Sequence, residues 1–343
     1  MKFNSKINAL YLTDNLYKYE ASDYQIDIIK SLSRKLNITE YGPNYSFFRE
    51  KYKFNDIESL FQKKFDILIL GHSWLPDFPT NNNFFFKDRI IKDIKIPKIM
   101  FLNKEYVNLK SKIKFGINNK FDIIFSHHHI AKYLNKIHKT KFEFLPFATN
   151  FNNIKKLSKK NYDLSFVGIL KNLNKLYNHT NTRETVRNLI YYNFRNISLL
   201  KKKEFKNYKI FWQSHPRNAF ENILSKIFMA KRLNRNDYRE VLETSRLVLN
   251  TPSPYSIIGP RYYDSLALGS PIICPKKKFL YKHYFDDDDL IQFENMTDFK
   301  KKMDLYIENK DLLQEKSLKI FNKYKVENYD TRMAKVLDLI VKI

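Results

Sequence analysis

The chain has 343 residues, a formal net charge of +26 and an aromatic content of 16%. This length suggests two domains, and so many aromatic residues exclude a disordered chain. The positive charge favours polyanionic partners, with nucleic acid, anionic lipid headgroups and nucleotide substrates as candidates. Compositional drift is the alternative, because the chain is also rich in Asn, Ile, Tyr and Phe, residues with A/T-rich codons.

A single cysteine, Cys274, excludes an internal disulfide and a cysteine-based zinc site. This cysteine usage fits a reducing cytoplasm. No window approaches 18 uninterrupted apolar residues, and the first residues lack the apolar core of a signal peptide. We therefore expect a cytoplasmic protein that contacts membranes, if at all, peripherally and at the inner face.

Short apolar runs alternate with polar or helical patterns in the first half of the chain. Strands are expected at 7–12, 65–70, 98–102, 121–125 and 142–145. The spacing of Ile26, Ile29 and Leu32 predicts a helix over 22–36, with Ser22 as its N-cap. Such alternation is typical of a parallel sheet that is buried on both faces.

The same alternation resumes after a polar, lysine-rich stretch at 150–161, which predicts a linker. Strands are expected at 164–168, 208–213, 247–250, 271–274 and 290–293, and helices at 182–192, 237–242, 260–268, 297–309, 311–324 and 331–343. The sequence thus predicts an α/β fold of two doubly wound, Rossmann-like domains that face each other across a cleft. The expected bounds are 1–150 and 151–325, with 326–343 as a helix that packs back toward the first domain.

The most informative segment, 245–273, contains a strand, a Pro/Ser/Gly loop, a helix, a glycine stop and another strand. Gly259 lets the backbone approach a ligand, and Pro260 suits the first helical position, where free N–H groups bind anions. Arg261 opposes the helix dipole unless it meets a phosphate. Asp264 can accept hydrogen bonds from two ribose hydroxyls. The alternative is a surface helix on which Arg261 and Asp264 form an i,i+3 ion pair.

The run R-Y-Y-D-S-L-A-L-G-S-P-I-I at 261–273 resembles the donor-site segment of group 1 glycosyltransferases with the GT-B fold. In that family an acidic residue lies five positions before the glycine of an A-x-G-x-P-V-I stretch. The CgeB-like branch is the most similar, because it also resembles this chain at 145–150, at 162–168 and in the tail around Tyr329 and Arg332. The resemblance covers the second half well and the first half mostly as a pattern.

The resemblance implies that Asp264 binds the nucleotide ribose, that Arg261 and the amides near Gly259 face the diphosphate, and that Gly168 and Lys171 lie beside the phosphates or the acceptor. Many relatives carry two glutamates spaced E-x7-E. Here the first of these positions is Ser256. A carboxylate that would contact the transferred sugar is therefore missing, which leaves the sugar and the stereochemistry open.

Further basic residues follow the apolar run at 208–212, where a GT-B second domain usually contacts the base or the phosphates. The guanidinium of Arg217 matches phosphate oxygens, and a surface arginine is the alternative. Arg183 opens an expected helix and could act in the same way. The expected donor contacts are Gly168, Lys171, Arg183, His215, Arg217, Tyr255, Ser256, Gly259, Arg261 and Asp264.

Two histidine-containing segments follow apolar runs of the first domain. In Ser126-His127-His128-His129, a cleft histidine could act as general base toward an acceptor hydroxyl. A structural or capping role and a metal site are the alternatives. In Gly71-His72-Ser73-Trp74, the histidine and the tryptophan could line the acceptor pocket, although tryptophan is more often core. We expect acceptor contacts from His72, Trp74, His127 and His128, and catalytic roles for His127 and Arg261.

The four aspartates at 286–289 lack the alternate spacing of a calcium loop and predict a solvated turn. No Walker A or G-x-G-x-x-G pattern occurs. We expect no metal and no cofactor besides a nucleotide-diphosphate sugar as co-substrate.

The expected activity is transfer of a hexose-like sugar to a hydroxyl of a glycan, lipid-linked or other acceptor, in cell-surface polysaccharide or glycoconjugate synthesis. Two alternatives stay open. One is a basic nucleic-acid-binding protein. The other is a GT-B protein that binds nucleotide sugars without turnover, as Ser256 would allow.

Overall fold

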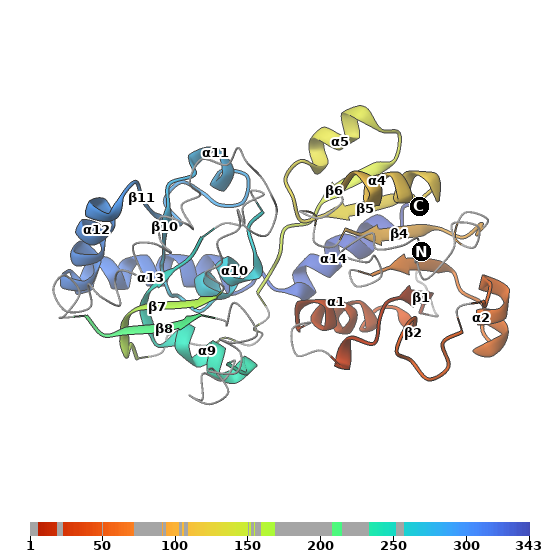
Figure 1. Cartoon of the computed structure of the whole chain (residues 1–343), viewed down its shortest axis with the longest axis horizontal. Coiled ribbons are helices and arrows are strands. Elements are labelled where there is room, and N and C mark those ends of the chain that lie inside the picture. The colour runs from red at the N-terminus through yellow and green to blue at the C-terminus, as the bar shows by residue number, and fades with distance from the viewer. Residues whose placement is uncertain are drawn as a thin grey trace, which may run out of the picture. The chain divides into compact units, whose positions relative to one another are not determined.

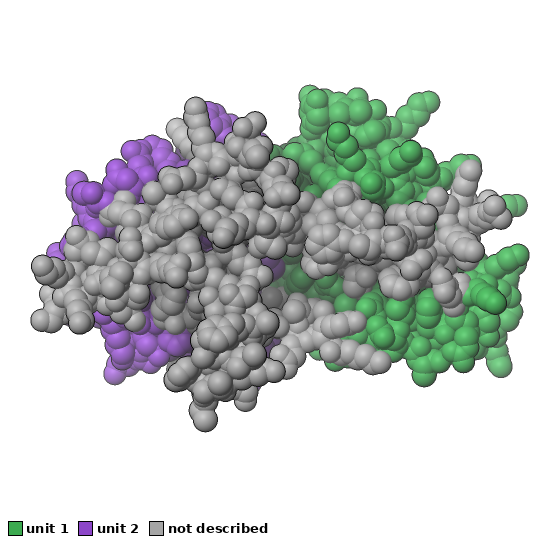
Figure 2. Space-filling model, viewed as in Figure 1, with its two compact units in different colours: residues 1–150, 328–343 green, residues 151–327 purple. Residues whose placement is uncertain are grey.

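A computed structural model describes most of the chain. The described residues are 6–18, 23–49, 51–71, 91, 94–102, 105, 109–149, 151, 154, 159–168, 208–214, 233–251 and 257–343. The chain divides into two compact units (Figure 2). Unit 1 comprises residues 1–150 and 328–343, and unit 2 comprises residues 151–327.

Unit 1 is built on a six-stranded sheet in the order β2-β1-β3-β4-β5-β6, and every pair of neighbours is parallel (Figure 1). The strands are β1 (Asn8–Leu12), β2 (Asn37–Tyr41), β3 (Ile67–Leu70), β4 (Lys98–Phe101), β5 (Ile123–Ser126) and β6 (Lys141–Phe144). The central strands β3, β4 and β5 are buried along their whole length, because helices cover both faces of the sheet.

Two sets of helices cover the two faces of this sheet. One face packs Ile57, Ile113 and Leu134, and the other packs Ile28 and Met333. The helices of the first face are α2 (Phe54–Leu60), α4 (Leu109–Asn118) and α5 (Ala131–Ile137). The second face carries α1 (Asp23–Ser33) and α14 (Tyr329–Ile340), and a short 3-10 helix spans Leu16–Lys18.

The last helix of the chain belongs to unit 1. Ser31 Oγ on α1 donates a hydrogen bond of 2.6 Å to Asp330 Oδ1, and Arg34 forms an ion pair with the same carboxylate. Asn328 caps α14 by accepting a hydrogen bond of 3.0 Å from Thr331 N. The chain therefore returns to the first unit after it has formed the second.

Unit 2 has a five-stranded parallel sheet in the order β11-β10-β9-β7-β8. Its strands are β7 (Tyr162–Gly168), β8 (Ile210–Ser214), β9 (Ser245–Leu249), β10 (Ile272–Pro275) and β11 (Ile291–Phe293). Its described helices are α9 (Arg235–Glu243), α10 (Pro260–Ala267), α11 (Lys278–Tyr281), α12 (Met296–Glu308) and α13 (Lys310–Tyr324). The prediction of an α/β fold with two parallel sheets is confirmed. The expected helix at 182–192 and the N-cap Ser22 lie outside the described residues.

The prediction of a solvated turn at 286–289 is wrong for its last residue. Asp289 is buried and accepts hydrogen bonds from Lys323 Nζ at 2.7 Å and from the hydroxyl of Tyr324. Asp286 and Asp288 stay exposed and pair with Lys323 and Lys319 of the same helix. The aspartate turn is thus tied to α13, because that helix directs its lysines toward it.

Candidate functional site

The carboxyl ends of the unit 2 strands lie along one edge of the sheet, since all five strands are parallel. Parallel α/β sheets bind ligands at this edge. β7 ends there at Gly168, and the neighbouring β9 is followed by Asn250 and Thr251. Helix α10 comes next in the chain, so its first turn begins on the same side of the sheet.

The first turn of α10 is half-buried and carries no negative charge. Gly259 is the N-cap residue with extended backbone angles, Pro260 is the first helical residue, and Gly259 has no side chain that could cap the helix. No acidic residue lies in the first turn. Within the described parts of the chain, no atom from beyond Gly259 and its neighbours along the chain lies within 4 Å of the point where a β-carbon on Gly259 would sit. The positive end of the helix is therefore accessible to an anion.

The other end of α10 is fixed by a glycine, as the sequence predicts. Gly269 has a φ of 67°. Its N–H donates to Leu266 O at 3.0 Å, and Ser270 N donates to Ser265 O at 2.9 Å. These two bonds form a Schellman motif, which ends the helix and satisfies its last carbonyls. The hydroxyls of Tyr262 and Tyr281 are 3.1 Å apart and join α10 to α11.

A buried amide beside Arg261 has an unused donor. Arg261 Nη1 donates to Asn250 Oδ1 at 3.4 Å, and Thr251 N donates to the same oxygen at 2.9 Å. These two donors identify the oxygen of the amide, so Nδ2 points elsewhere. In the described residues, Asn250 Nδ2 is buried without a hydrogen-bond partner. A buried donor left unpaired costs about 1–3 kcal/mol, which a ligand oxygen would recover.

Asp264 contacts a tyrosine that sequence reasoning missed. Its side chain is 1% exposed, and its Oδ2 accepts a hydrogen bond of 3.2 Å from the hydroxyl of Tyr238 on α9. Burial, and after it the charge of Asp264, raises the pKa of Tyr238 well above its ordinary value, while Arg261 acts in the opposite direction. The Tyr238 hydroxyl thus interacts with both α10 residues. A direct contact of Asp264 with a ribose stays a prediction, since the observed contact is with Tyr238.

In unit 1, a buried carboxylate holds the loop that follows β5. Glu105 Oε1 accepts a hydrogen bond of 2.6 Å from His127 N, and Glu105 Oε2 accepts one of 2.5 Å from Ser126 Oγ. Burial raises the pKa of Glu105 to about 7, although these hydrogen bonds and Lys112 oppose the shift. The sequence offered no signal for Glu105, because it lies outside the apolar runs and 21 residues before its hydroxyl partner.

The two predicted histidines of this loop have structural contacts. The ring of His127 stacks on Phe147 with 3.8 Å between centroids, and its Nδ1 is 2.6 Å from Leu145 O, to which it must donate. Burial lowers the pKa of His127 to about 4, so the ring is neutral and weakly basic. His128 Nδ1 accepts a hydrogen bond of 3.1 Å from Ile130 N, next to the start of α5. The capping alternative fits His128, and the catalytic role of His127 stays a prediction.

The structure describes six of the fourteen predicted site residues. Gly168, Gly259, Arg261 and Asp264 lie in unit 2, and His127 and His128 lie in unit 1. The predicted residues outside the described part of the chain are His72, Trp74, Lys171, Arg183, His215, Arg217, Tyr255 and Ser256.

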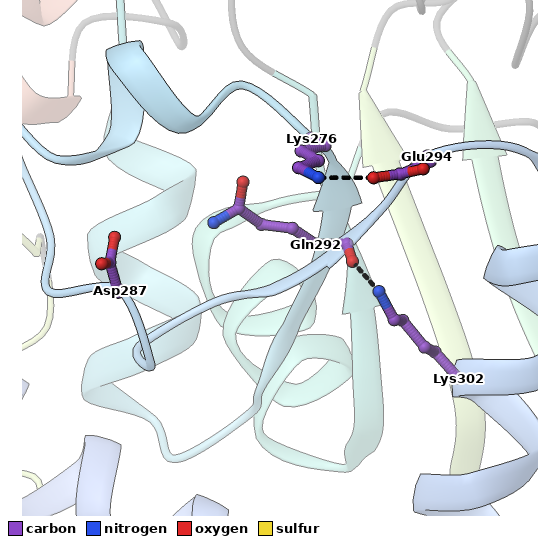
Figure 3. Close-up of a pocket in the computed structure, with 5 residues that line it drawn as sticks. All are labelled: Lys276, Asp287, Gln292, Glu294 and Lys302. Atoms are coloured by element: carbon purple, nitrogen blue, oxygen red, sulfur yellow. Dashed lines mark hydrogen bonds and ion pairs between the residues drawn. The ribbon is translucent and has the colours of Figure 1, made fainter.

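A small polar pocket lies beyond the ends of β10 and β11 (Figure 3). It is lined by Lys276, Asp287, Gln292, Glu294 and Lys302. Lys276 forms an ion pair with Glu294, and Lys302 Nζ donates to the backbone oxygen of Gln292. Lys276 and Glu294 thus neutralise each other, and none of the predicted donor residues lines the pocket. The first turn of α10 is therefore the better candidate site in unit 2.

Neither a metal cluster nor an active thiol is found in the described residues. No group of three or more His, Cys, Asp or Glu side chains there could hold a metal ion. Cys274 is buried, and burial raises its thiol pKa to about 12. Nor is any helix of the described parts long and apolar enough to cross a membrane.

Comparison with known proteins found a matching family model and several similar solved structures. A family model described as glycosyl transferase-like matches residues 194–338. The sequence matches no curated protein. The matched residues lie in the second half of the chain and end within α14.

Several solved structures share the fold along almost the whole chain. The Anabaena protein HepE, in complex with UDP and glucose, is 10% identical with a TM-score of 0.59, covering 98% of this chain and 100% of HepE. A glycosyltransferase from Rickettsia africae is 11% identical with a TM-score of 0.55, covering 98% of both chains. MnaA of S. aureus, with UDP, is 11% identical with a TM-score of 0.54, covering 98% of this chain and 97% of MnaA. The likeness shows the fold, which is GT-B.

Proposed function

We propose that this protein is a glycosyltransferase that binds a nucleotide-diphosphate sugar in unit 2 and transfers the sugar to an acceptor hydroxyl. The glycosyl transferase-like match and the GT-B fold support the class. The structures of HepE and MnaA contain UDP, which makes a UDP-sugar the first donor to test. The finer proposal is a glycan or lipid-linked acceptor in cell-surface polysaccharide or glycoconjugate synthesis, in the manner of the CgeB-like branch.

The observation that carries the proposal is the unpaired Asn250 Nδ2 beside Arg261 and the uncapped start of α10. All three features offer hydrogen-bond donors, and the first turn offers no carboxylate to oppose an anion. A diphosphate supplies charged oxygens for each of them. The same groups would stabilise the departing nucleoside diphosphate.

The transfer step follows from this placement of the diphosphate. The acceptor oxygen forms a bond to the anomeric carbon, and the bond from that carbon to the diphosphate oxygen breaks. The bonding electrons leave with the nucleoside diphosphate, whose added charge Arg261 and the amides of α10 balance. The acceptor proton leaves to a base. We keep His127 as a candidate for contact with the acceptor, although its low pKa makes it a weak base.

Calorimetric titration with UDP and a panel of nucleotide sugars tests this site. Arg261→Met should weaken binding about 10- to 100-fold, the value of one charge-assisted hydrogen bond. Asn250→Asp keeps the oxygen that Thr251 contacts but replaces the NH2 by an anionic oxygen, so it should weaken binding at least as much. Arg246→Met is the matched control. Arg246 lies near the amino end of β9, the strand that Asn250 follows, and pairs with Asp163. Unchanged nucleotide affinity in both site variants would refute the assignment of the donor site to the start of α10.

A nucleotide-sugar-binding protein without turnover is the second candidate, favoured by Ser256 at the first position of the E-x7-E pattern. Measurement of UDP release from bound UDP-sugars, with and without an acceptor panel, separates the two functions. Binding without release of UDP under any acceptor would favour the second candidate.

A further inference from the structure

One outward face of unit 1 combines exposed apolar side chains with unpaired lysines. On α5, Tyr133 and Ile137 are 62% and 56% exposed. They stand one helical turn apart and therefore lie on the same side of the helix. Single exposed apolar residues are ordinary, but two neighbours on a basic helix form a patch that calls for an explanation.

The charged side chains of α5 and of the turn that follows it are all lysines. Residues 123–142 include lysines at 132, 136, 139 and 141 and no aspartate or glutamate. Lys141 pairs with Glu143 at 3.0 Å. Lys132, Lys136 and Lys139 are exposed, and no acid of the described chain forms an ion pair with them. The neighbouring helix α4 adds the exposed Lys110 and Lys114 on the same face of the sheet.

The patch belongs to a rigid element. Ala131 and Leu134 of α5 are buried in the core of unit 1. Asn135 clamps the helix to β6, since its Nδ2 donates to Phe142 O and its Oδ1 accepts from Phe142 N, both at 2.6 Å. In Figure 1, α5 lies beside β6, at the edge of the unit 1 sheet. The residues of the outer face take no part in these contacts, so they can be changed without loss of the fold.

We propose that this α5 face, formed by Lys132, Tyr133, Lys136, Ile137 and Lys139, docks the protein on an anionic lipid surface. The lysines meet the headgroup phosphates, because a negative leaflet attracts a basic segment. Tyr133 places its ring at the interface, with its hydroxyl in water, and Ile137 enters the acyl boundary. The alternation of basic and apolar side chains favours lipid over nucleic acid, which would give Ile137 nothing to contact. The proposal does not depend on the assignment of the donor site in unit 2.

Sedimentation of the full-length protein with vesicles tests the proposal. The parent should bind vesicles of phosphatidylcholine mixed with phosphatidylglycerol and should bind phosphatidylcholine alone far more weakly. The triple variant Lys132→Gln, Lys136→Gln, Lys139→Gln should lose roughly 100-fold in affinity for the mixed vesicles. The control variant Lys301→Gln, Lys310→Gln, Lys335→Gln removes the same charge from exposed positions elsewhere and should bind like the parent. Equal losses in both variants would mean that net charge alone drives binding, which overturns the proposal.

A second variant tests the apolar half of the surface. Tyr133→Ser with Ile137→Ser leaves every lysine in place and should remove the part of the binding that survives high salt. If this variant retained the parent's affinity at every salt concentration, the face would not enter the bilayer and the proposal would fail. A parent that binds an oligonucleotide through the same lysines but ignores anionic vesicles would also overturn it. Circular dichroism of each variant confirms that the fold is kept.

Discussion

Glu105 and His127 make the stability of unit 1 depend on pH in opposite directions. Burial raises the pKa of Glu105 from 4.5 to about 7 and lowers the pKa of His127 from 6.5 to about 4. The two residues are linked through the backbone, since the N–H of His127 donates to Glu105, while the His127 ring contacts Leu145 O. Each shift corresponds to about 3 kcal/mol of stability.

The signs follow from which state holds the proton. Between about pH 4.5 and 7, folded Glu105 keeps a proton that the unfolded chain has released, so stability falls as pH rises. Between about pH 4 and 6.5, unfolded His127 holds a proton that the folded state lacks, so stability rises with pH. In the parent protein these two slopes nearly cancel from about pH 4.5 to 6.5.

Single substitutions should separate the two slopes. Glu105→Gln leaves His127, so the stability of unit 1 should increase by about 3 kcal/mol as pH rises from 4 to 6.5. His127→Gln leaves Glu105, so stability should decrease by about 3 kcal/mol as pH rises from 4.5 to 7. Both replacements are neutral at every pH and can hydrogen bond.

Hydrogen exchange measured by mass spectrometry reports this effect for unit 1 alone. Peptides that cover β5 should change their protection about 100-fold across these pH ranges, after correction for intrinsic exchange rates. Glu143→Gln is the control, because this residue on β6 pairs with Lys141 and not with the loop after β5. If both variants kept the pH profile of the parent, the reasoning about burial would be refuted.

Two further predictions concern α10. Tyr238→Phe removes the hydroxyl that donates to the buried Asp264. The free energy of unfolding in urea titrations should fall by about 1–3 kcal/mol. An unchanged urea midpoint would show that Asp264 does not need this hydroxyl. Gly269→Ala should lower the free energy of unfolding by about 1 kcal/mol, because alanine disfavours the positive φ at this position. Gly259→Ala should leave the free energy of unfolding unchanged, because the φ there is negative. Calorimetry should then show weaker nucleotide binding for Gly259→Ala, and equal affinity would argue against close approach of a ligand to this backbone.

The sequence by itself determined the parts of the fold that depend on local patterns. The apolar runs that became β3, β4 and β5 can be predicted because strands buried on both faces need apolar side chains at most positions. The start of α10 at Pro260 and its stop at Gly269 can be predicted because proline fixes a φ that suits a helix start, whereas glycine tolerates the positive φ at a helix end. The edge strand β2 was missed, since its half-exposed residues NITEY lack such a pattern. The helices α2, α4 and α5 were missed as well, with seven, ten and seven residues.

Only the tertiary structure decided which polar groups are buried and what they contact. Asn250 and Arg261 meet across the loop that joins β9 to α10, and Tyr238 reaches Asp264 from another helix. Asp289 is buried by Tyr324, a residue 35 positions away. Such contacts depend on how distant elements pack, and no local periodicity encodes them. The sequence could therefore indicate the helix at which a nucleotide sugar is proposed to bind, while the unpaired amide beside it became visible only in the folded chain.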